Sequence, residues 1–453
     1  MKQVKVRVNF DKIVGKIKPL HAVNDVPSAH FCFGEAEKYI RFSAEAGVPY
    51  CRLHDVCGRY GANVFVDVSN VFRNFDADEN DPQNYDFVFT DKLLELLNAN
   101  GIKPFYRLGE TIENDFFIKR YRTFPPKDNL KWAKICEHII RHYNYGWANG
   151  FNYGIEYWEI WNEPDNASTA ERNQMWSGTP EQFYELYSVA AHYLKKLFPE
   201  IKIGGYGSVG FYSIAQKELD PTANAEAGAS WFYVEYFDNF IKYIKNKEYA
   251  VPLDFFTWHS YSNVEQNLIY AKYVRKTLDE NGFKNTESNC NEWNPGIANR
   301  CLPKDAAFVA CNMLMWQNAP IDMAMYYNSR ISSDYAGWFN PLTCKPTKNF
   351  YAFKSFGRLY SLKSQAFAET DDKETFAVCA TDGKEVALMI ADYSGEDKKL
   401  VIDSLDGIKD LKAFVIDESR TFEETDDISE ELKTFKKYGV ILITGKKINV
   451  KGK

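Results

Sequence analysis

The segment Ile155-Glu156-Tyr157-Trp158-Glu159-Ile160-Trp161-Asn162-Glu163-Pro164-Asp165 predicts a short apolar strand that ends at a glutamate and a chain-turning proline. A second segment, Asn289-Cys290-Asn291-Glu292-Trp293-Asn294-Pro295, has the same form. Each places one glutamate at a strand end, between asparagine and tryptophan residues. The fold therefore decides what the two glutamates do, because it decides whether the two strand ends meet.

The first segment contains one of eight predicted strands, which alternate with predicted helices between about residues 14 and 327. The predicted strands are 18–24, 48–54, 102–108, 155–161, 201–206, 254–259, 286–292 and 321–327. The predicted helices are 34–46, 86–100, 129–144, 180–198, 230–247, 264–281 and 304–318. This alternation favours a closed (β/α)8 TIM barrel. A doubly wound open sheet is the alternative, but no glycine-rich phosphate-binding turn follows the first strand.

Glu163 and Glu292 would end the fourth and seventh strands, on roughly opposite walls of such a barrel. Barrel active sites lie at the C-terminal ends of the strands. Cleavage of a glycosidic bond needs one carboxyl to protonate the leaving oxygen and a second to meet the cationic sugar carbon. We therefore predict that these two residues are catalytic. Asn162 would hydrogen-bond the sugar 2-hydroxyl, and Glu159 would be an ion-pair partner deeper in the barrel.

Other residues at strand ends are candidates for substrate binding. His54, His259 and Tyr327 end predicted strands, although a histidine there can equally be a core residue. Arg52 is expected inside the barrel, where it would keep the nucleophile's carboxylate ionised. A metal site at His54, Asp55 and Cys57 is the competing interpretation, but the spacing matches no common zinc pattern, so no metal is predicted.

After about residue 350 the pattern changes to short strands with alternating apolar residues. Strands at 374–380 and 385–393 flank the hairpin signal Thr381-Asp382-Gly383-Lys384, and further strands are predicted at 399–402, 411–417 and 438–444. We predict an accessory β-sandwich over 351–453, joined by an N-terminal strand within 1–13, and a catalytic barrel over 14–350. The acidic stretch 418–431 is expected to be a solvated loop.

Composition narrows the class of protein further. The net charge is −7 with dispersed basic residues, which argues against a nucleic-acid or anionic-membrane partner. Residues 2–10 alternate valines with charges, as a strand does and a signal peptide does not. The nine cysteines are odd in number and lack a CxxC pair, so we expect reduced thiols and a cytoplasmic location.

With these residues in view, the chain resembles glycoside hydrolase family 39, the β-xylosidase and α-L-iduronidase family of retaining clan A. The run from Trp158 to Asp165 resembles the acid/base motif of that family, and Arg52-Leu53-His54 with Tyr85-Asp86-Phe87 matches its segment after strand two. The run Asp254-Phe255-Phe256-Thr257-Trp258-His259-Ser260-Tyr261 resembles its strand-six motif. The resemblance covers roughly residues 15–360. It implies Glu163 as acid/base, Glu292 as nucleophile, and Asn162, His54, His259 and Tyr261 as substrate-binding residues.

The chain departs from the family after strand eight. There the family's xylosidases carry a tryptophan and acidic residues, whereas this chain reads Tyr326-Tyr327-Asn328-Ser329-Arg330-Ile331-Ser332-Ser333-Asp334. Residues 291–294 also differ from the usual nucleophile context. Trp338 is predicted as the aromatic sugar platform, with a core position as the alternative. Arg330 would either bind a uronate carboxylate or form a structural ion pair.

We accordingly predict a retaining, exo-acting, β-xylosidase-like hydrolase that needs no cofactor. It would release a terminal pentose or related sugar from plant-type oligosaccharides. Other specificities remain open, namely an α-L-arabinosidase, an α-L-iduronidase-like or an endo-acting enzyme, as does a barrel that binds sugar without cleaving it. The expected partner is an oligosaccharide, and whether the chain forms a homo-oligomer is left open.

Overall fold

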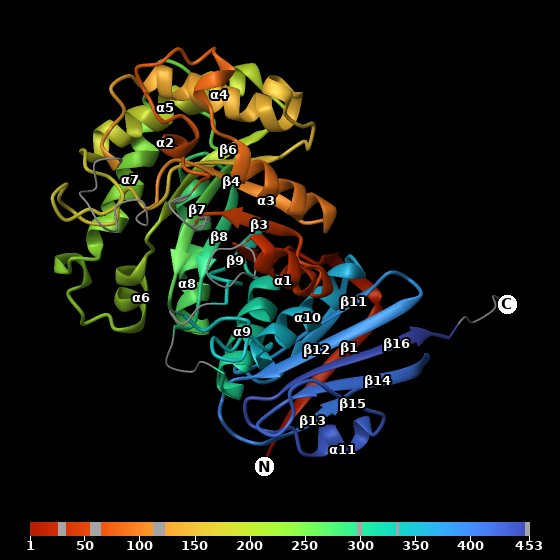
Figure 1. Ribbon diagram of the computed structural model, residues 1–453. Helices are drawn as coiled ribbons and strands as arrows, with labels where there is room; N and C mark the ends of the chain where they lie inside the picture. The colour runs from red at the N-terminus through yellow and green to blue at the C-terminus, as the bar shows by residue number, and fades with distance from the viewer. Residues whose placement is uncertain (26–32, 55–64, 112–122, 297–300, 332–334, 449–453) are drawn as a thin grey trace.

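Eight short parallel strands form a closed barrel, which confirms the predicted fold class (Figure 1). The computed structural model describes residues 1–25, 33–54, 65–111, 123–296, 301–331 and 335–448. The barrel strands are β2 (Ala22–Asn24), β3 (Tyr50–Leu53), β4 (Lys103–Leu108), β5 (Tyr157–Ile160), β6 (Lys202–Ser208), β7 (Phe255–Ser260), β8 (Glu287–Trp293) and β9 (Met323–Tyr326). Pairing of Val23 with Tyr326 closes the barrel between β2 and β9.

Helices alternate with the barrel strands along the chain. The long helices are α1 (Phe33–Glu45), α3 (Val88–Ala99), α4 (Asn129–Tyr145), α5 (Pro180–Leu197), α7 (Trp231–Lys245), α8 (Val264–Glu280), α9 (Pro303–Gln317) and α10 (Lys348–Ser361). Shorter ones are α2 (Val68–Val71), α6 (Tyr212–Leu219) and α11 (Ile428–Lys433). Thr179 and Gln182 form a capping box at the start of α5. Among the described residues, no helix is both long enough and apolar enough to cross a membrane.

Helix α10 was not predicted, because the sequence from residue 350 onward was interpreted as strands. Its buried residues Phe350, Phe353 and Phe356 recur every three positions, which is helical spacing. Helices α9 and α10 pack against β11 and β12 of the second domain. In Figure 1 these two helices lie between the barrel and the blue C-terminal strands. The barrel and the accessory domain therefore meet through the last two barrel helices.

The accessory strands form one curled sheet of eight strands. They are β1 (Lys2–Lys16), β10 (Ser364–Thr370), β11 (Thr375–Thr381), β12 (Glu385–Asp392), β13 (Lys398–Ile402), β14 (Ile408–Ile416), β15 (Glu423–Thr425) and β16 (Val440–Lys447). Their order is β13-β1-β10-β11-β12-β16-β14-β15. Strand β1 is antiparallel to β10 and parallel to β13, and Val6 pairs with both Thr370 and Ile402. The red β1 among blue strands in Figure 1 shows this joining of distant segments.

The acidic stretch 418–431 is largely exposed, as predicted, but it is not an irregular loop. It contains β15 and the start of α11, and it is stabilised by charge pairing. Arg420 donates to Asp417 and forms an ion pair with Glu431 at 2.6 Å. The compensating arginine lies inside the stretch, so a count of its acidic residues alone gave the wrong interpretation.

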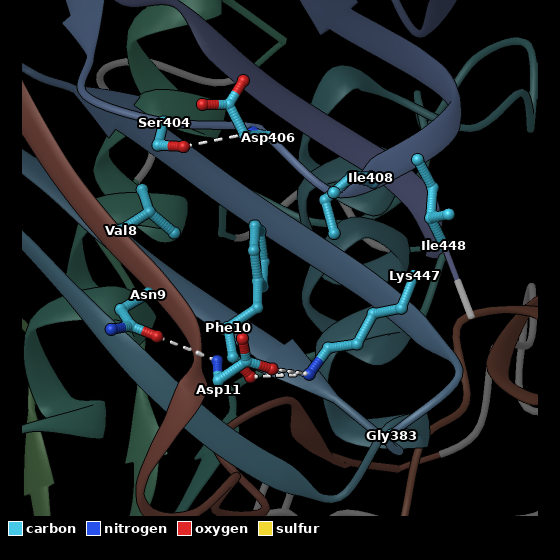
Figure 2. Close-up of a pocket in the computed structure, with 11 residues that line it drawn as sticks. Val8, Asn9, Phe10, Asp11, Gly383, Ser404, Asp406, Ile408, Lys447 and Ile448 are labelled. Atoms are coloured by element: carbon cyan, nitrogen blue, oxygen red, sulfur yellow. Dashed lines mark hydrogen bonds and ion pairs between the residues drawn. The ribbon is translucent and has the colours of Figure 1, made fainter. Parts of the chain in front are cut away.

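A groove with a volume of about 520 Å³ lies at one end of the curled sheet (Figure 2). Its lining comes from β1, the β13–β14 connection and the end of β16. Lys447 Nζ lies 2.7 Å from Asp11 Oδ1 and donates to the carbonyl oxygen of Phe10 at 3.0 Å. These contacts link the interior of β1 to β16, a strand with which β1 shares no ladder, and so they show how far the sheet curls.

A buried ion cluster joins the start of the edge strand β13 to the neighbouring ends of β11 and β12. The Lys398 ammonium pairs with Asp392, lies 3.2 Å from Asp372 Oδ1 and donates to Thr375 Oγ1 at 3.0 Å. The side chains of all three charged residues are almost completely buried. Such a cluster is stable only while its charges remain matched.

We expect Lys398→Met to lower the free energy of unfolding by about 3–5 kcal/mol, because Asp392 would keep only neutral partners in a buried site. Chemical denaturation would measure the loss. The matched control is Lys412→Met, which removes the exposed pair with Glu424 and should change stability little. Equal losses in the two variants would contradict the importance of burial.

Candidate active site

The two predicted catalytic glutamates meet at the C-terminal mouth of the barrel. Glu163 follows β5, and Glu292 lies in β8. One carboxylate oxygen of Glu163 and one of Glu292 lie within 4.8 Å of each other, with a ring nitrogen of His259 in the same cluster. The Glu292 side chain is 8% exposed and that of Glu163 is 18% exposed. The two strand ends that the sequence pointed to are therefore brought together.

A β-bulge in β8 directs two consecutive side chains into the barrel. Trp258 of β7 pairs with Cys290, but the next residue, His259, pairs with Glu292, so one residue of β8 is extra. Asn291 donates to Glu159 Oε1 at 2.6 Å, while Glu292 accepts from Arg52 at 3.2 Å. In a regular strand these two neighbours would point to opposite faces.

Arg52 of β3 is the central cation of the site. Its Nε donates to Glu159 Oε2 at 2.7 Å, one Nη donates to Glu292 Oε2 at 3.2 Å, and the other donates to Asn162 Oδ1 at 2.6 Å. Arg52 and Glu159 are fully buried, as predicted for an internal ion pair. Thr257 donates to the second oxygen of Glu159 at 2.7 Å. The charged side chains inside the barrel are therefore paired, and their hydrogen bonds fix their orientations.

His259 lies between the two glutamates. Its Nδ1 is 2.7 Å from Glu163 Oε1 and 3.7 Å from Glu292 Oε2. Burial lowers the pKa of this histidine to about 4, so the imidazole is neutral near pH 7. Burial also raises the pKa of Glu292 above its usual 4.5, and the charge of Glu163 adds to this, whereas the charge of Arg52 opposes it.

The same three side chains offer ligand atoms at a spacing that a metal ion could use. However, the contact between His259 and Glu163 has the length of a hydrogen bond and needs a proton between the two atoms. Two ligands of one metal ion would each direct a lone pair at it instead. The geometry is that of a hydrogen bond between the two side chains. Asp55 and Cys57, the other residues of the metal alternative, lie outside the described residues.

Glycine at position 207 lets β6 approach this cluster closely. Gly207 has φ +65, and an added Cβ would lie 3.1 Å from both Asn162 Oδ1 and His259 Nε2. Its carbonyl oxygen also accepts the backbone N–H of Glu163 at 3.0 Å. A larger residue here would press on the side chains around the glutamates.

Tyr261 and Tyr327 extend the site toward the loop after β9. The Tyr261 hydroxyl donates to Glu292 Oε1 at 2.5 Å. The ring of Tyr335 lies 5.2 Å from that of Tyr261 and 5.3 Å from that of Tyr327. The three tyrosines form an aromatic wall beside Glu292.

The ion pair of Arg330, which the sequence left open, is a structural one. Arg330 Nε is 3.3 Å from Asp25 Oδ2.

His54 lies at the end of β3 and is 4% exposed. Its backbone carbonyl accepts from Arg107 at 2.9 Å, and Arg107 pairs with Asp67. The structure thus places His54 beside a second buried ion pair, at the strand end where it was predicted.

The predicted platform role of Trp338 is corrected. Trp338 is fully buried, with its ring 5.0 Å from Phe353 and 5.6 Å from Phe350 of α10. A sugar needs an accessible ring face, and this one is covered by the helix that the sequence did not predict. Trp338 is a core residue.

Several residues of the polar network were not recognised in the sequence. Asn24, Thr257 and Asn291 each hydrogen-bond Arg52 or Glu159. All three are polar residues in strands expected to line a buried barrel interior, and that signal could have identified them. Tyr335 had no such signal, because it follows β9 in an irregular segment.

The sequence is similar to those of known proteins along most of its length. The sequence profile of the family described as "Glycosyl hydrolases family 39" matches residues 4–332. A β-xylosidase of Caldicellulosiruptor saccharolyticus is 23% identical over 465 residues, which covers 92% of this chain and 86% of that protein.

Two solved structures share the fold along nearly the whole chain. A glucosidase from Croceicoccus marinus has a TM-score of 0.75 at 21% identity, with 99% of this chain and 100% of that chain covered. A monomeric β-xylosidase from Caulobacter crescentus CB15 has a TM-score of 0.67 at 16% identity, with the same coverage. At these identities the likeness shows the architecture only.

We expect Trp338→Ala to lower the free energy of unfolding by about 3–5 kcal/mol and to leave KM nearly unchanged, because the change opens a cavity in the core. Thermal melts and steady-state kinetics would measure the two effects. Tyr335→Ala is the matched control and should show the reverse pattern, since Tyr335 is partly exposed beside Tyr261. A stable Trp338→Ala variant with a strongly raised KM would return Trp338 to the sugar site.

Proposed function

Since the chain belongs to glycosyl hydrolase family 39, we propose that it is a retaining, exo-acting enzyme of β-xylosidase-like specificity. It would release a terminal pentose or related sugar from plant-type oligosaccharides. The observation that carries the retaining mechanism is the approach of the Glu163 and Glu292 carboxylate oxygens to within 4.8 Å. Retaining enzymes hold the two carboxyl groups about 5–5.5 Å apart, and inverting enzymes about 6.5–9.5 Å.

In the first step Glu292 attacks the anomeric carbon while Glu163 gives its proton to the leaving oxygen. The attacking carboxylate must be ionised. Arg52 stabilises its charge at 3.2 Å, and the Tyr261 hydroxyl donates to its other oxygen. These two contacts direct the Glu292 oxygens, so the nucleophile approaches in one orientation.

In the second step Glu163 acts as the base that activates water, and the glycosyl–Glu292 bond breaks. Neutral His259 supports both states of Glu163 through the 2.7 Å contact at Nδ1. Because burial holds the pKa of His259 at about 4, the imidazole does not retain the proton that Glu163 must deliver. The same contact keeps the Glu163 carboxyl near the substrate.

One contact argues against a uronate as the bound sugar, and another prepares Asn162 to bind the 2-hydroxyl that pentoses and uronates share. Asn162 Oδ1 is occupied by Arg52, which leaves its Nδ2 to donate to the sugar 2-hydroxyl. Arg330 is already paired with Asp25, so its charge is matched before any substrate carboxylate arrives. The full-length relative described as a β-xylosidase is consistent with this choice.

The first test is hydrolysis of a panel of nitrophenyl glycosides, followed by proton NMR of the first-formed sugar. We expect the highest kcat/KM on the β-xyloside, and a product with the anomeric configuration of the substrate. A preference for the β-glucoside would keep the mechanism and change the sugar. A product of inverted configuration would refute double displacement.

The second test separates the roles of the two glutamates. Glu292→Ala should lose hydrolysis by several orders of magnitude, and azide should restore turnover as a glycosyl azide of inverted configuration, because azide occupies the space of the lost nucleophile. Glu163→Ala with azide should instead yield a glycosyl azide of retained configuration. The opposite pattern of products would exchange the two roles.

A further inference from the structure

A further carboxyl group lies in the same turn as the acid/base candidate and has no part in the mechanism above. Asp165 is two residues after Glu163, and its side chain is completely buried. Burial raises the pKa of Asp165 to about 7, and the neighbouring charge of Glu163 adds to this. Burial of a carboxyl group costs free energy unless hydrogen bonds compensate for the lost water, so the contacts of Asp165 must supply that compensation.

Asp165 binds the C-terminal end of the neighbouring strand β6. Its Oδ2 accepts the Ser208 hydroxyl at 2.7 Å, and its Oδ1 accepts the backbone N–H of Val209 at 3.2 Å. Ser208 is the last residue of β6 and is itself fully buried. Both carboxylate oxygens are therefore used to attach the turn after β5 to the end of β6.

Glu163 depends on its surroundings to keep its backbone conformation. Its φ is 44, in the left-handed region that non-glycine residues rarely adopt. Its N–H donates to the carbonyl oxygens of Tyr206 and Gly207 at 3.1 and 3.0 Å, also on β6. The turn is thus held on β6 from both sides of Pro164, at Glu163 and at Asp165.

We propose that Asp165 is a positioning residue for the acid/base: it anchors the turn of residues 163–166 to β6 and so sets the direction of the Glu163 carboxyl. The proposal rests on the proposed role of Glu163. Without the anchor, Glu163 would lose its alignment with His259 and with the leaving oxygen. A misplacement of about 1 Å can cost on the order of 100-fold in rate.

This role predicts a loss confined to the steps that use Glu163. Protonation matters for a poor leaving group such as an alkyl alcohol or unsubstituted phenol, and hardly at all for dinitrophenol. We expect Asp165→Ala to lower kcat/KM about 10- to 100-fold on the phenyl glycoside and less than about 3-fold on the dinitrophenyl glycoside. A general structural defect would lower both equally.

Asp165→Asn is the conservative variant. Its amide can accept the Val209 N–H through Oδ1 and donate to Ser208 Oγ through Nδ2, so it should restore most of the lost activity on the phenyl glycoside. Ser208→Ala removes one of the two anchoring bonds and should give an intermediate loss, which keeps the test open if Asp165→Ala does not fold. Equal losses on the two substrates in these variants would overturn the proposal.

Two control measurements separate a failure of this proposal from a failure of the proposed function. Glu163→Ala must show the largest difference between the substrates; if it shows none, the acid/base assignment fails. The position of Glu163 in a crystal structure of Asp165→Ala then decides the role of Asp165 independently of activity. Loss of the 2.7 Å contact with His259 would support the anchor, and an unmoved Glu163 would overturn it. Asp392→Ala, which removes a buried carboxyl of β12, should affect both substrates equally.

Discussion

The ion pair between Arg52 and Glu159 is the interaction on which the rest of the site depends. It lies in the barrel interior with both side chains fully buried, so loss of Arg52 would leave the Glu159 carboxylate without a cation at a cost of about 3–5 kcal/mol. The remaining hydrogen bonds of the pair extend to β2, β7 and β8. A bottom layer of apolar residues closes the barrel below it. The nucleophile candidate Glu292 is therefore hydrogen-bonded to a charged network that joins several strands. A shift of one of these strands would disturb the contacts of the others.

This network gives two chemically identical side chains different surroundings. Glu292 is enclosed between Arg52 and Tyr261, whereas Glu163 is more exposed and contacts His259 and Asn166. Environments that differ in this way are what allow one carboxyl to carry a proton while its neighbour is ionised. The division of labour proposed for the pair rests on the contacts of Arg52 and Tyr261, which favour the ionised form of Glu292.

The sequence was sufficient for the barrel and for the positions of the strand ends, since apolar segments and their polar ends depend on local composition. The family resemblance is likewise confirmed by the match over residues 4–332. The bulge that turns both Asn291 and Glu292 inward depends on pairing with β7 and has no local signal. Trp338 was misplaced because its burial depends on α10, which was not predicted. The pairing of the accessory strands into a single curled sheet likewise depends on segments that lie far apart along the chain. The roles of the individual site residues stay a prediction.

The pairing of β1 has a consequence for how the chain is made. Val6 finds its ladder partners only at Thr370 and Ile402, so β1 leaves the ribosome long before either exists. At about 5–20 residues per second the wait is roughly 20–70 seconds. During that time the valines at positions 4, 6 and 8, which are buried in the folded protein, lack the strands that β1 pairs with. The charged residues between them, Lys5 and Arg7, are of the kind that discourages a waiting strand from pairing with other nascent chains.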